Sequence, residues 1–154
     1  MSDAAVTVRL ARPEDYDAWL PLWLGYNAFY GREGATAPAE RITRLTWSRF
    51  FEALEPMECL VAEADGRLIG LAHLIYHRNT MLEGCTCYLQ DLFAAPEARG
   101  RGVGRALIEA LYARAKALGA QRVYWHTHET NAQARLLYDR VAAHGGFLLY
   151  RKDL

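Results

Sequence analysis

The sequence predicts a single α/β domain built round one mixed β-sheet, with the element order β-α-α-β-β-β-α-β-α-β. The chain has 154 residues, which is enough for one domain with its own hydrophobic core. Its composition, 52% hydrophobic and 23% charged residues, is that of a globular protein. Short apolar or β-branched runs alternate with segments of helical periodicity, and this mixture is typical of helices packed on a central sheet. We therefore expect residues 1–154 to form one domain.

The N-terminal third is expected to contain one strand and two helices. Residues 6–10 alternate and are rich in β-branched side chains, which favours a strand. Pro13, followed by two acidic residues, indicates the first turn of a helix, which Gly31 then ends. A second helix is predicted to open at residues 36–40 and to end before Pro56.

A hairpin and a third strand are expected in the middle of the chain. Residues 58–64 and 67–76 are two apolar runs that flank the dipeptide Asp65-Gly66. Asp-Gly between apolar runs is the strongest short-range hairpin signal, because both turn residues must adopt positive φ. Residues 87–94 form a further apolar run of strand length.

The C-terminal half is expected to alternate helix and strand. A long helix after Pro96 ends at Gly119, and it is followed by a strand at 122–127, a helix from Asn131 to about His144 and a last strand at 146–150. The apolar positions of the long helix recur at helical spacing and predict its core face. They are Val103, Leu107, Ala110, Leu111 and Leu118.

Charge and cysteine content narrow the possible functions. Eighteen basic and eighteen acidic residues give a formal net charge of zero, which argues against a nucleic-acid partner. No run approaches 18 apolar residues and the N-terminus lacks a signal-like pattern, so neither a membrane nor a secretory route is expected. Cys59, Cys85 and Cys87 form no C-x-x-C pair, which fits the reducing cytoplasm.

The strongest functional signal is the glycine-rich turn Arg99-Gly100-Arg101-Gly102-Val103-Gly104-Arg105. Glycines before a helix let an anion approach unpaired backbone N–H groups, and the three arginines add positive charge, so a phosphate or pyrophosphate ligand is predicted. A dinucleotide fingerprint fails at Arg105, and no Gly-Lys pair supports a P-loop. The pattern R/Q-x-x-G-x-G/A is satisfied by Arg99, Gly102 and Gly104. A helix cap with scattered surface arginines is the structural alternative.

Two motifs together resemble the GCN5-related N-acetyltransferase (GNAT) superfamily. The first is the run Tyr88–Ala94 with Pro96 and the glycine-rich turn, and the second is Asn131–Tyr138 followed by Gly145-Gly146-Phe147. The similarity is greatest to the yeast Hpa-type and polyamine-type small-amine acetyltransferases. The resemblance implies acetyl-CoA as co-substrate and no metal. The coenzyme is expected to be held by main chain at Leu92, Phe93 and Ala94 and by the side chains of Asn131 and Tyr138. The residues of the glycine-rich turn are expected to bind it as well: Arg99, Gly100, Arg101, Gly102, Val103, Gly104 and Arg105.

The resemblance also implies direct attack of an amine on the thioester. Tyr138, seven residues after Asn131, is expected to be the general acid beside the leaving sulfur. The base is open: Gln90 stands where polyamine acetyltransferases have a Glu and cannot accept a proton, so Asp91 and Glu129 are the candidates, with His126 and His128 as further ones. Asp91 faces away from Gln90 if the strand is regular.

The acceptor is expected to be the primary amine of a small molecule such as a polyamine or an amino acid. Trp23, Tyr26 and Tyr30, together with Gln90, are predicted to bind it, although the spacing of Trp23 and Tyr26 also suits core packing. A protein lysine or N-terminal acetyltransferase and a non-catalytic acyl-CoA sensor are the alternatives. A homodimer is expected, with exposed residues of the last strand such as Phe147 and Leu149 contributing.

Overall fold

A computed structural model describes residues 4–154 and contains one five-stranded sheet in the order β1-β2-β3-β4-β5. Neighbouring strands are antiparallel except β4 and β5, which are parallel, so the predicted mixed α/β class is confirmed. The strands are β1 (Thr7–Leu10), β2 (Met57–Ala64), β3 (Arg67–His77), β4 (Thr86–Ala94) and β5 (Arg122–Tyr124).

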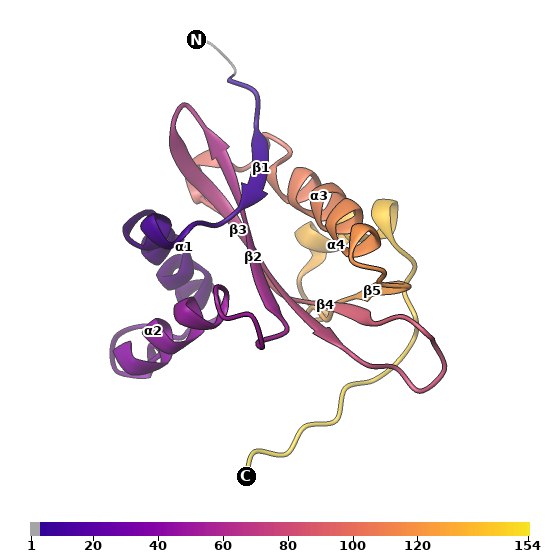
Figure 1. Cartoon of the computed structure of the whole chain (residues 1–154). Coiled ribbons are helices and arrows are strands. Elements are labelled where there is room, and N and C mark those ends of the chain that lie inside the picture. The colour runs from indigo at the N-terminus through magenta and orange to yellow at the C-terminus, as the bar shows by residue number, and fades with distance from the viewer. Residues whose placement is uncertain (1–3) are drawn as a thin grey trace.

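The helices form a layer on each side of the sheet (Figure 1). On one side lie α1 (Tyr16–Phe29) and α2 (Glu40–Arg49); on the other lie α3 (Val103–Ala117) and α4 (Ala132–Val141). A short 3-10 turn precedes each of α1, α2 and α3. These turns are η1 (Pro13–Asp15), η2 (Gly34–Thr36) and η3 (Pro96–Ala98). Within residues 4–154 no helix is both long and apolar enough to cross a membrane.

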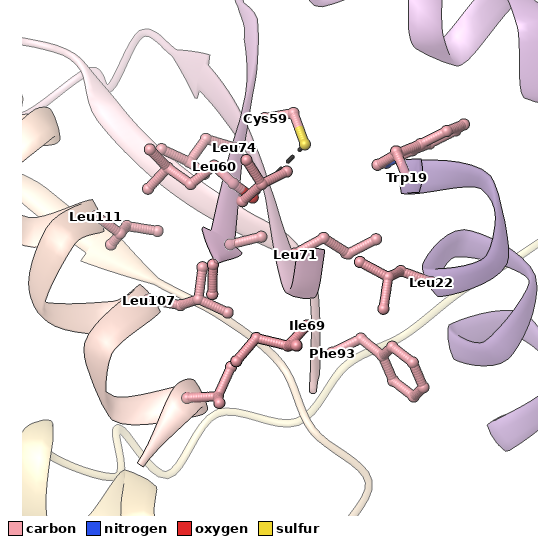
Figure 2. Close-up of a cluster of buried hydrophobic side chains, with 14 of the residues drawn as sticks. Trp19, Leu22, Cys59, Leu60, Ile69, Leu71, Leu74, Phe93, Leu107 and Leu111 are labelled. Carbon is pink, nitrogen blue, oxygen red and sulfur yellow. Dashed lines mark hydrogen bonds between the residues drawn. The ribbon is translucent and has the colours of Figure 1, made fainter. Parts of the chain in front are cut away.

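The hydrophobic core has a part on each face of the sheet. Figure 2 shows Leu107 and Leu111 of α3 on one side of the β2–β3 strands, and Trp19 and Leu22 of α1 on the other. Leu107 and Leu111 are one helical turn apart and Trp19 and Leu22 are three residues apart, so each pair lies on a single face of its helix. Both helices are therefore anchored to the sheet that carries the site described below.

The hairpin predicted at Asp65-Gly66 is present between β2 and β3. Both turn residues have positive φ, 52° for Asp65 and 70° for Gly66, as the tight connection requires. The ladder that follows is regular apart from a shift between Ala62 and Glu63.

The predicted last strand is not formed. The helix preceding it ends at Val141, not near His144, and residues 142–154 carry no strand. Phe147 and Tyr150 are 93% and 89% exposed, and the segment leads away from the body of the molecule as the yellow trace of Figure 1. A strand exists only where its backbone pairs with a neighbour, and none of the five strands within residues 4–154 pairs with this segment.

Two further expectations about element length are also corrected. The strand predicted at 122–127 is only Arg122–Tyr124, because its ladder with β4 stops at Tyr88↔Tyr124. Leu118, predicted as part of the core face of α3, is 46% exposed, since it caps the C-terminal end of the helix beyond the sheet. Ile108 is fully buried in its place on that face.

Candidate active site

The first part of the site is an open strand edge in the middle of the sheet. β4 pairs with β5 only over Thr86↔Arg122 to Tyr88↔Tyr124, whereas β4 itself continues to Ala94. Residues 89–94 therefore have no strand partner on their β5 side, although all of them except Gln90 stay paired with β3 on the other. An extended ligand with amide groups can add to such an edge through main-chain hydrogen bonds. Leu92, Phe93 and Ala94, the predicted binding segment, lie on this edge.

The glycine-rich turn lies directly beyond this edge, at the start of α3. Gly100 and Gly102 have φ of 79° and 74°, and a Cβ added at either would meet nothing within 4 Å. Ala106 is the first residue whose N–H bonds back into the helix, to Gly102 O at 2.9 Å. The N–H groups of residues 102–105 thus have no partner in the helix and lie at its positive end, where the space beside Gly100 and Gly102 is open. This arrangement fits an anionic phosphate or pyrophosphate group.

The three arginines of the turn are not equivalent. The guanidinium of Arg101 donates to the carbonyl of Ala4 at 3.1 Å, and its backbone N–H donates to Ala98 O at 3.3 Å. Arg101 therefore ties the turn to the N-terminal segment, and the free N–H groups begin at Gly102. Arg105 makes an exposed ion pair with Glu109, and Arg99 lies over the ring of Phe29 at 6.0 Å. Arg99 and Arg105 remain at the flanks of the turn.

Helix α4 presents the predicted acid, Tyr138. Its ring packs edge-on against Trp125 with the centroids 5.4 Å apart. Burial, with a smaller contribution from Tyr30, raises the pKa of Tyr138 to about 12. The phenol is therefore protonated at neutral pH and can donate a hydrogen bond. Asn131 caps the same helix and donates from Nδ2 to Thr127 Oγ1 at 3.2 Å.

Beside β4, on the α1–α2 face of the sheet, lies a pocket of about 410 Å³. It brings together four of the predicted residues, Trp23, Tyr26, Gln90 and Asp91, while Tyr30 stands next to it with its ring 5.1 Å from that of Tyr26. The full lining is Trp23, Tyr26, Asn27, Arg32, Pro38, Ile42, Thr46, Met57, His73, Ile75, Gln90 and Asp91. Trp23 is 9% exposed, so it serves both the core and the pocket wall.

A β-bulge explains why Gln90 and Asp91 line the same pocket. In the β3–β4 ladder His73 is opposite Asp91 and Leu74 is opposite Leu89, so Gln90 has no partner. A regular strand would have sent Gln90 and Asp91 to opposite faces, and the extra residue removes that alternation. The bulge therefore adds an amide and a carboxylate to one wall.

Asp91 is held by a buried hydrogen-bonded chain that the sequence did not reveal. Trp19 Nε1 donates to His73 Nε2 at 3.0 Å, and His73 Nδ1 lies 2.8 Å from Asp91 Oδ2. An indole N–H only donates, so Nε2 must accept and the proton of the neutral imidazole sits on Nδ1, directed at the carboxylate. Trp19, His73 and Asp91 are 0%, 1% and 8% exposed. The only available signal was a histidine inside the apolar run of β3.

The other base candidates lie outside the pocket. Glu129 is exposed on the segment between β5 and α4, where its carbonyl accepts from Arg135 at 3.0 Å. His126 Nδ1 lies 3.0 Å from the hydroxyl of Tyr88, and His128 Nδ1 lies 2.6 Å from Thr130 Oγ1. Asp91 is thus the one candidate base that the structure places in the pocket wall.

Two other features of residues 4–154 bear on the site. No group of three or more His, Cys, Asp or Glu side chains in this part of the chain is arranged to hold a metal ion. A second pocket, of about 350 Å³, is lined by residues that include Glu58, Tyr76 and Leu118. Since Leu118 marks the C-terminal end of α3, this pocket lies at the opposite end of the helix from the glycine-rich turn.

Comparison with known proteins gives a consistent result. A family profile described as "Acetyltransferase (GNAT) family" matches residues 19–143. The D-amino-acid N-acetyltransferase HPA3 of Saccharomyces cerevisiae is 34% identical over 155 aligned positions, covering 99% of this chain and 94% of the yeast protein.

Solved structures agree at the level of the fold. A transcriptional regulator from Bacillus halodurans superposes with a TM-score of 0.83 at 16% identity, over 97% of this chain and 100% of the other. AAC(6')-Iy in complex with a bisubstrate analogue of coenzyme A and acetylneamine superposes with a TM-score of 0.79 at 17% identity, over 98% and 99% of the two chains.

Proposed function

Because this chain belongs to the GNAT family of acetyltransferases, we propose that it transfers the acetyl group of acetyl-CoA to a primary amine of a small molecule, such as a polyamine or an amino acid. The yeast relative, named for D-amino acids, supports a small acceptor. One observation carries the proposal: the open edge of β4, the glycine-rich turn and the pocket all meet at residues 90–102.

The donor is proposed to lie along the open edge of β4. The N–H groups of residues 102–105 hold its pyrophosphate, and the main chain of Leu92–Ala94 pairs with its amide arm. Arg99, Gly100, Arg105 and Asn131 complete the contacts, while Arg101 fixes the turn from behind. Acetyl-CoA supplies a thioester, whose carbonyl carbon is the electrophile. The pocket on the α1–α2 face then lies next to the reacting end of this edge.

The reaction is proposed to be a single displacement. The neutral amine forms a C–N bond to the acetyl carbon, the C–S bond breaks, and the sulfur leaves with the electron pair as a thiolate. Tyr138 donates a hydrogen bond to this sulfur, and its raised pKa keeps the proton available for that purpose. The proton lost by the nitrogen passes to Asp91 or to water, and His73 fixes the position of Asp91. Glu129 is the other predicted acceptor of that proton.

The test is an acceptor screen with purified protein and acetyl-CoA. Polyamines, amino acids, aminoglycosides and lysine peptides are offered in turn, and the free thiol of the product coenzyme is measured. The proposal predicts turnover with at least one class of small amine and little with the peptides. Turnover confined to lysine peptides or protein N-termini would replace it with a protein acetyltransferase.

Two further properties are proposed for the whole molecule. We propose a homodimer, because the exposed apolar residues Phe147, Leu148 and Leu149 lie on a segment that pairs with no strand among residues 4–154. We also propose a cytoplasmic location, because Cys59, Cys85 and Cys87 are all free thiols. Light scattering of the parent and of a chain truncated after residue 145 tests the first proposal, since the truncation should yield monomers.

A further inference from the structure

The pocket beside β4 contains one negative and one positive side chain. Among the described residues that line it, Asp91 is acidic, Arg32 is basic, and the remainder are neutral, with His73 held as a neutral hydrogen-bond relay. A pocket for a molecule with several cationic groups would be expected to hold several carboxylates and no guanidinium. The charges therefore suit a ligand that carries both signs.

The negative end of the pocket is fixed in place. His73 donates to Asp91 Oδ2 at 2.8 Å, and Trp19 Nε1 fixes the tautomer that makes this donation possible. The Tyr26 hydroxyl also hydrogen-bonds the Asp91 carboxylate. Each carboxylate oxygen has more than one lone pair, so Asp91 can still receive an ammonium group in the pocket.

The positive end of the pocket, the Arg32 guanidinium, is also held in place by hydrogen bonds. Arg32 donates from Nε to Asn27 Oδ1 at 2.8 Å, and its backbone N–H donates to Asn27 O at 2.9 Å. Asn27 is itself 1% exposed and donates from Nδ2 to the carbonyl of Trp23 at 2.9 Å. A buried amide thus positions one edge of the guanidinium. The other nitrogens, Nη1 and Nη2, have no acidic partner within 4.0 Å among residues 4–154.

Two tyrosine rings lie beside the charged groups of this pocket. The guanidinium carbon of Arg32 lies 5.7 Å from the ring centre of Tyr26 and 5.4 Å from that of Tyr30. Burial raises the pKa of Tyr26 above its ordinary value, Asp91 raises it further, and Arg32 lowers it, so both charges act on one phenol. Tyr26 therefore lies close to both the carboxylate and the guanidinium.

We propose that the acceptor is an amino acid or a similar small amine with a carboxylate group: Asp91 receives the amine end and Arg32 binds the carboxylate. Planar guanidinium groups bind carboxylates through paired N–H donors, and the free Nη1 and Nη2 are available for this contact. Arg32 is thus a specificity-determining residue, which the sequence alone did not reveal. The inference rests on the proposed acetyl transfer, and it excludes polyamines as the preferred acceptors.

The test compares matched acceptors that differ only in the carboxylate. Phenylalanine, as both enantiomers, and phenethylamine share the amine and the ring, and spermidine serves as a polyamine. The parent enzyme is expected to show a kcat/KM about 10- to 100-fold higher for an amino acid than for its decarboxylated amine, the range for a hydrogen bond to a charged group. Arg32→Gln should remove this preference by raising KM for the amino acid, and it should leave phenethylamine within about threefold.

Two additional measurements keep the result decisive. Arg44→Gln removes an exposed arginine that pairs with Glu40 on α2, so this control should retain the preference. Calorimetry with the protein saturated by coenzyme A measures amino-acid and amine binding without turnover. Amino-acid binding that depends on Arg32, with no acetylation of any amine, would contradict the proposed reaction and support this pocket assignment. Equal affinity for both ligands, or an equal loss for both in Arg32→Gln, would overturn the inference about Arg32.

Discussion

Tyr138→Phe is the most direct test of the proposed chemistry, because it removes one hydroxyl and leaves the ring that packs on Trp125. The pKa of Tyr138, raised to about 12, decides what the hydroxyl can do. An alkyl thiol has a pKa near ~8.5, so complete proton transfer from this phenol to the thiolate is uphill by about 5 kcal/mol. We therefore propose that Tyr138 acts by donating a hydrogen bond to the developing negative charge.

The expected effect follows from that role. Losing one such contribution lowers kcat by about 10²-fold, or about 2.7 kcal/mol of activation free energy. The affinity for acetyl-CoA should change little, since most of the coenzyme contacts are proposed to be main-chain contacts at β4 and the start of α3. The raised pKa adds a second expectation: kcat of the parent should show no alkaline loss from this tyrosine up to about pH 10, where an ordinary tyrosine with a pKa of about 10 would already be half ionised.

The assay is steady-state acetyl transfer from pH 6 to 10, combined with calorimetry of acetyl-CoA binding. Tyr112→Phe is the matched control, because the hydroxyl of Tyr112 donates to Val141 O at 2.8 Å and so supports α4 without facing the pocket. It should lower the melting temperature slightly and leave kcat within about twofold. Unchanged kcat in Tyr138→Phe, or an equal fall in both variants, would refute the assigned role of Tyr138.

Two further substitutions test the parts of the fold that position the donor. Gly102→Val should abolish acetyl-CoA binding, because φ of 74° disfavours a β-branched residue and its side chain would enter the anion site. The control is Gly119→Val, at φ 80° and the other end of α3. It should cost comparable stability but retain acetyl-CoA binding in calorimetry. Gly70→Ala should lower the melting temperature, because its Cβ would lie 2.7 Å from Val103 Cγ1 and 2.9 Å from Phe93 O. Such overpacking costs about 2 kcal/mol, which corresponds to a fall in melting temperature of about 4–8 °C. A melting temperature at or above that of the parent would contradict this.

The glycine-rich turn of the proposed donor site could be predicted from the sequence, whereas the geometry of the acceptor pocket could not. Glycines such as Gly102 need a particular backbone conformation, so their spacing before a helix is visible in the sequence. The bulge at Gln90 has no such local signal, because it depends on how β4 pairs with β3. The position of His73 depends on its contact with Asp91, which is distant in sequence. The position of Arg32 depends on its contact with Asn27, which belongs to another element, α1.

The missing last strand has a similar explanation. Residues 146–150 have the apolar, β-rich composition of a strand, and the sequence-based prediction was reasonable on that ground. Composition specifies which residues suit a pleated surface, but a strand also needs an adjacent edge with free hydrogen-bonding groups. Among residues 4–154 no strand pairs with this segment, so the prediction of a strand was wrong for this structure.

Two irregularities of β4 together account for the position of the site. The bulge at Gln90 brings Asp91 and its neighbour to the α1–α2 face, and the separation from β5 after Tyr88 exposes the strand edge from Leu89 onward. A regular β4, paired along its whole length, would offer neither a polar wall nor free main-chain groups. Since both irregularities fall within a few residues, we propose that an extended donor along the edge and a small acceptor on the face meet at Gln90 and Asp91. Moving either irregularity would therefore separate the two substrates even if every predicted side chain were kept.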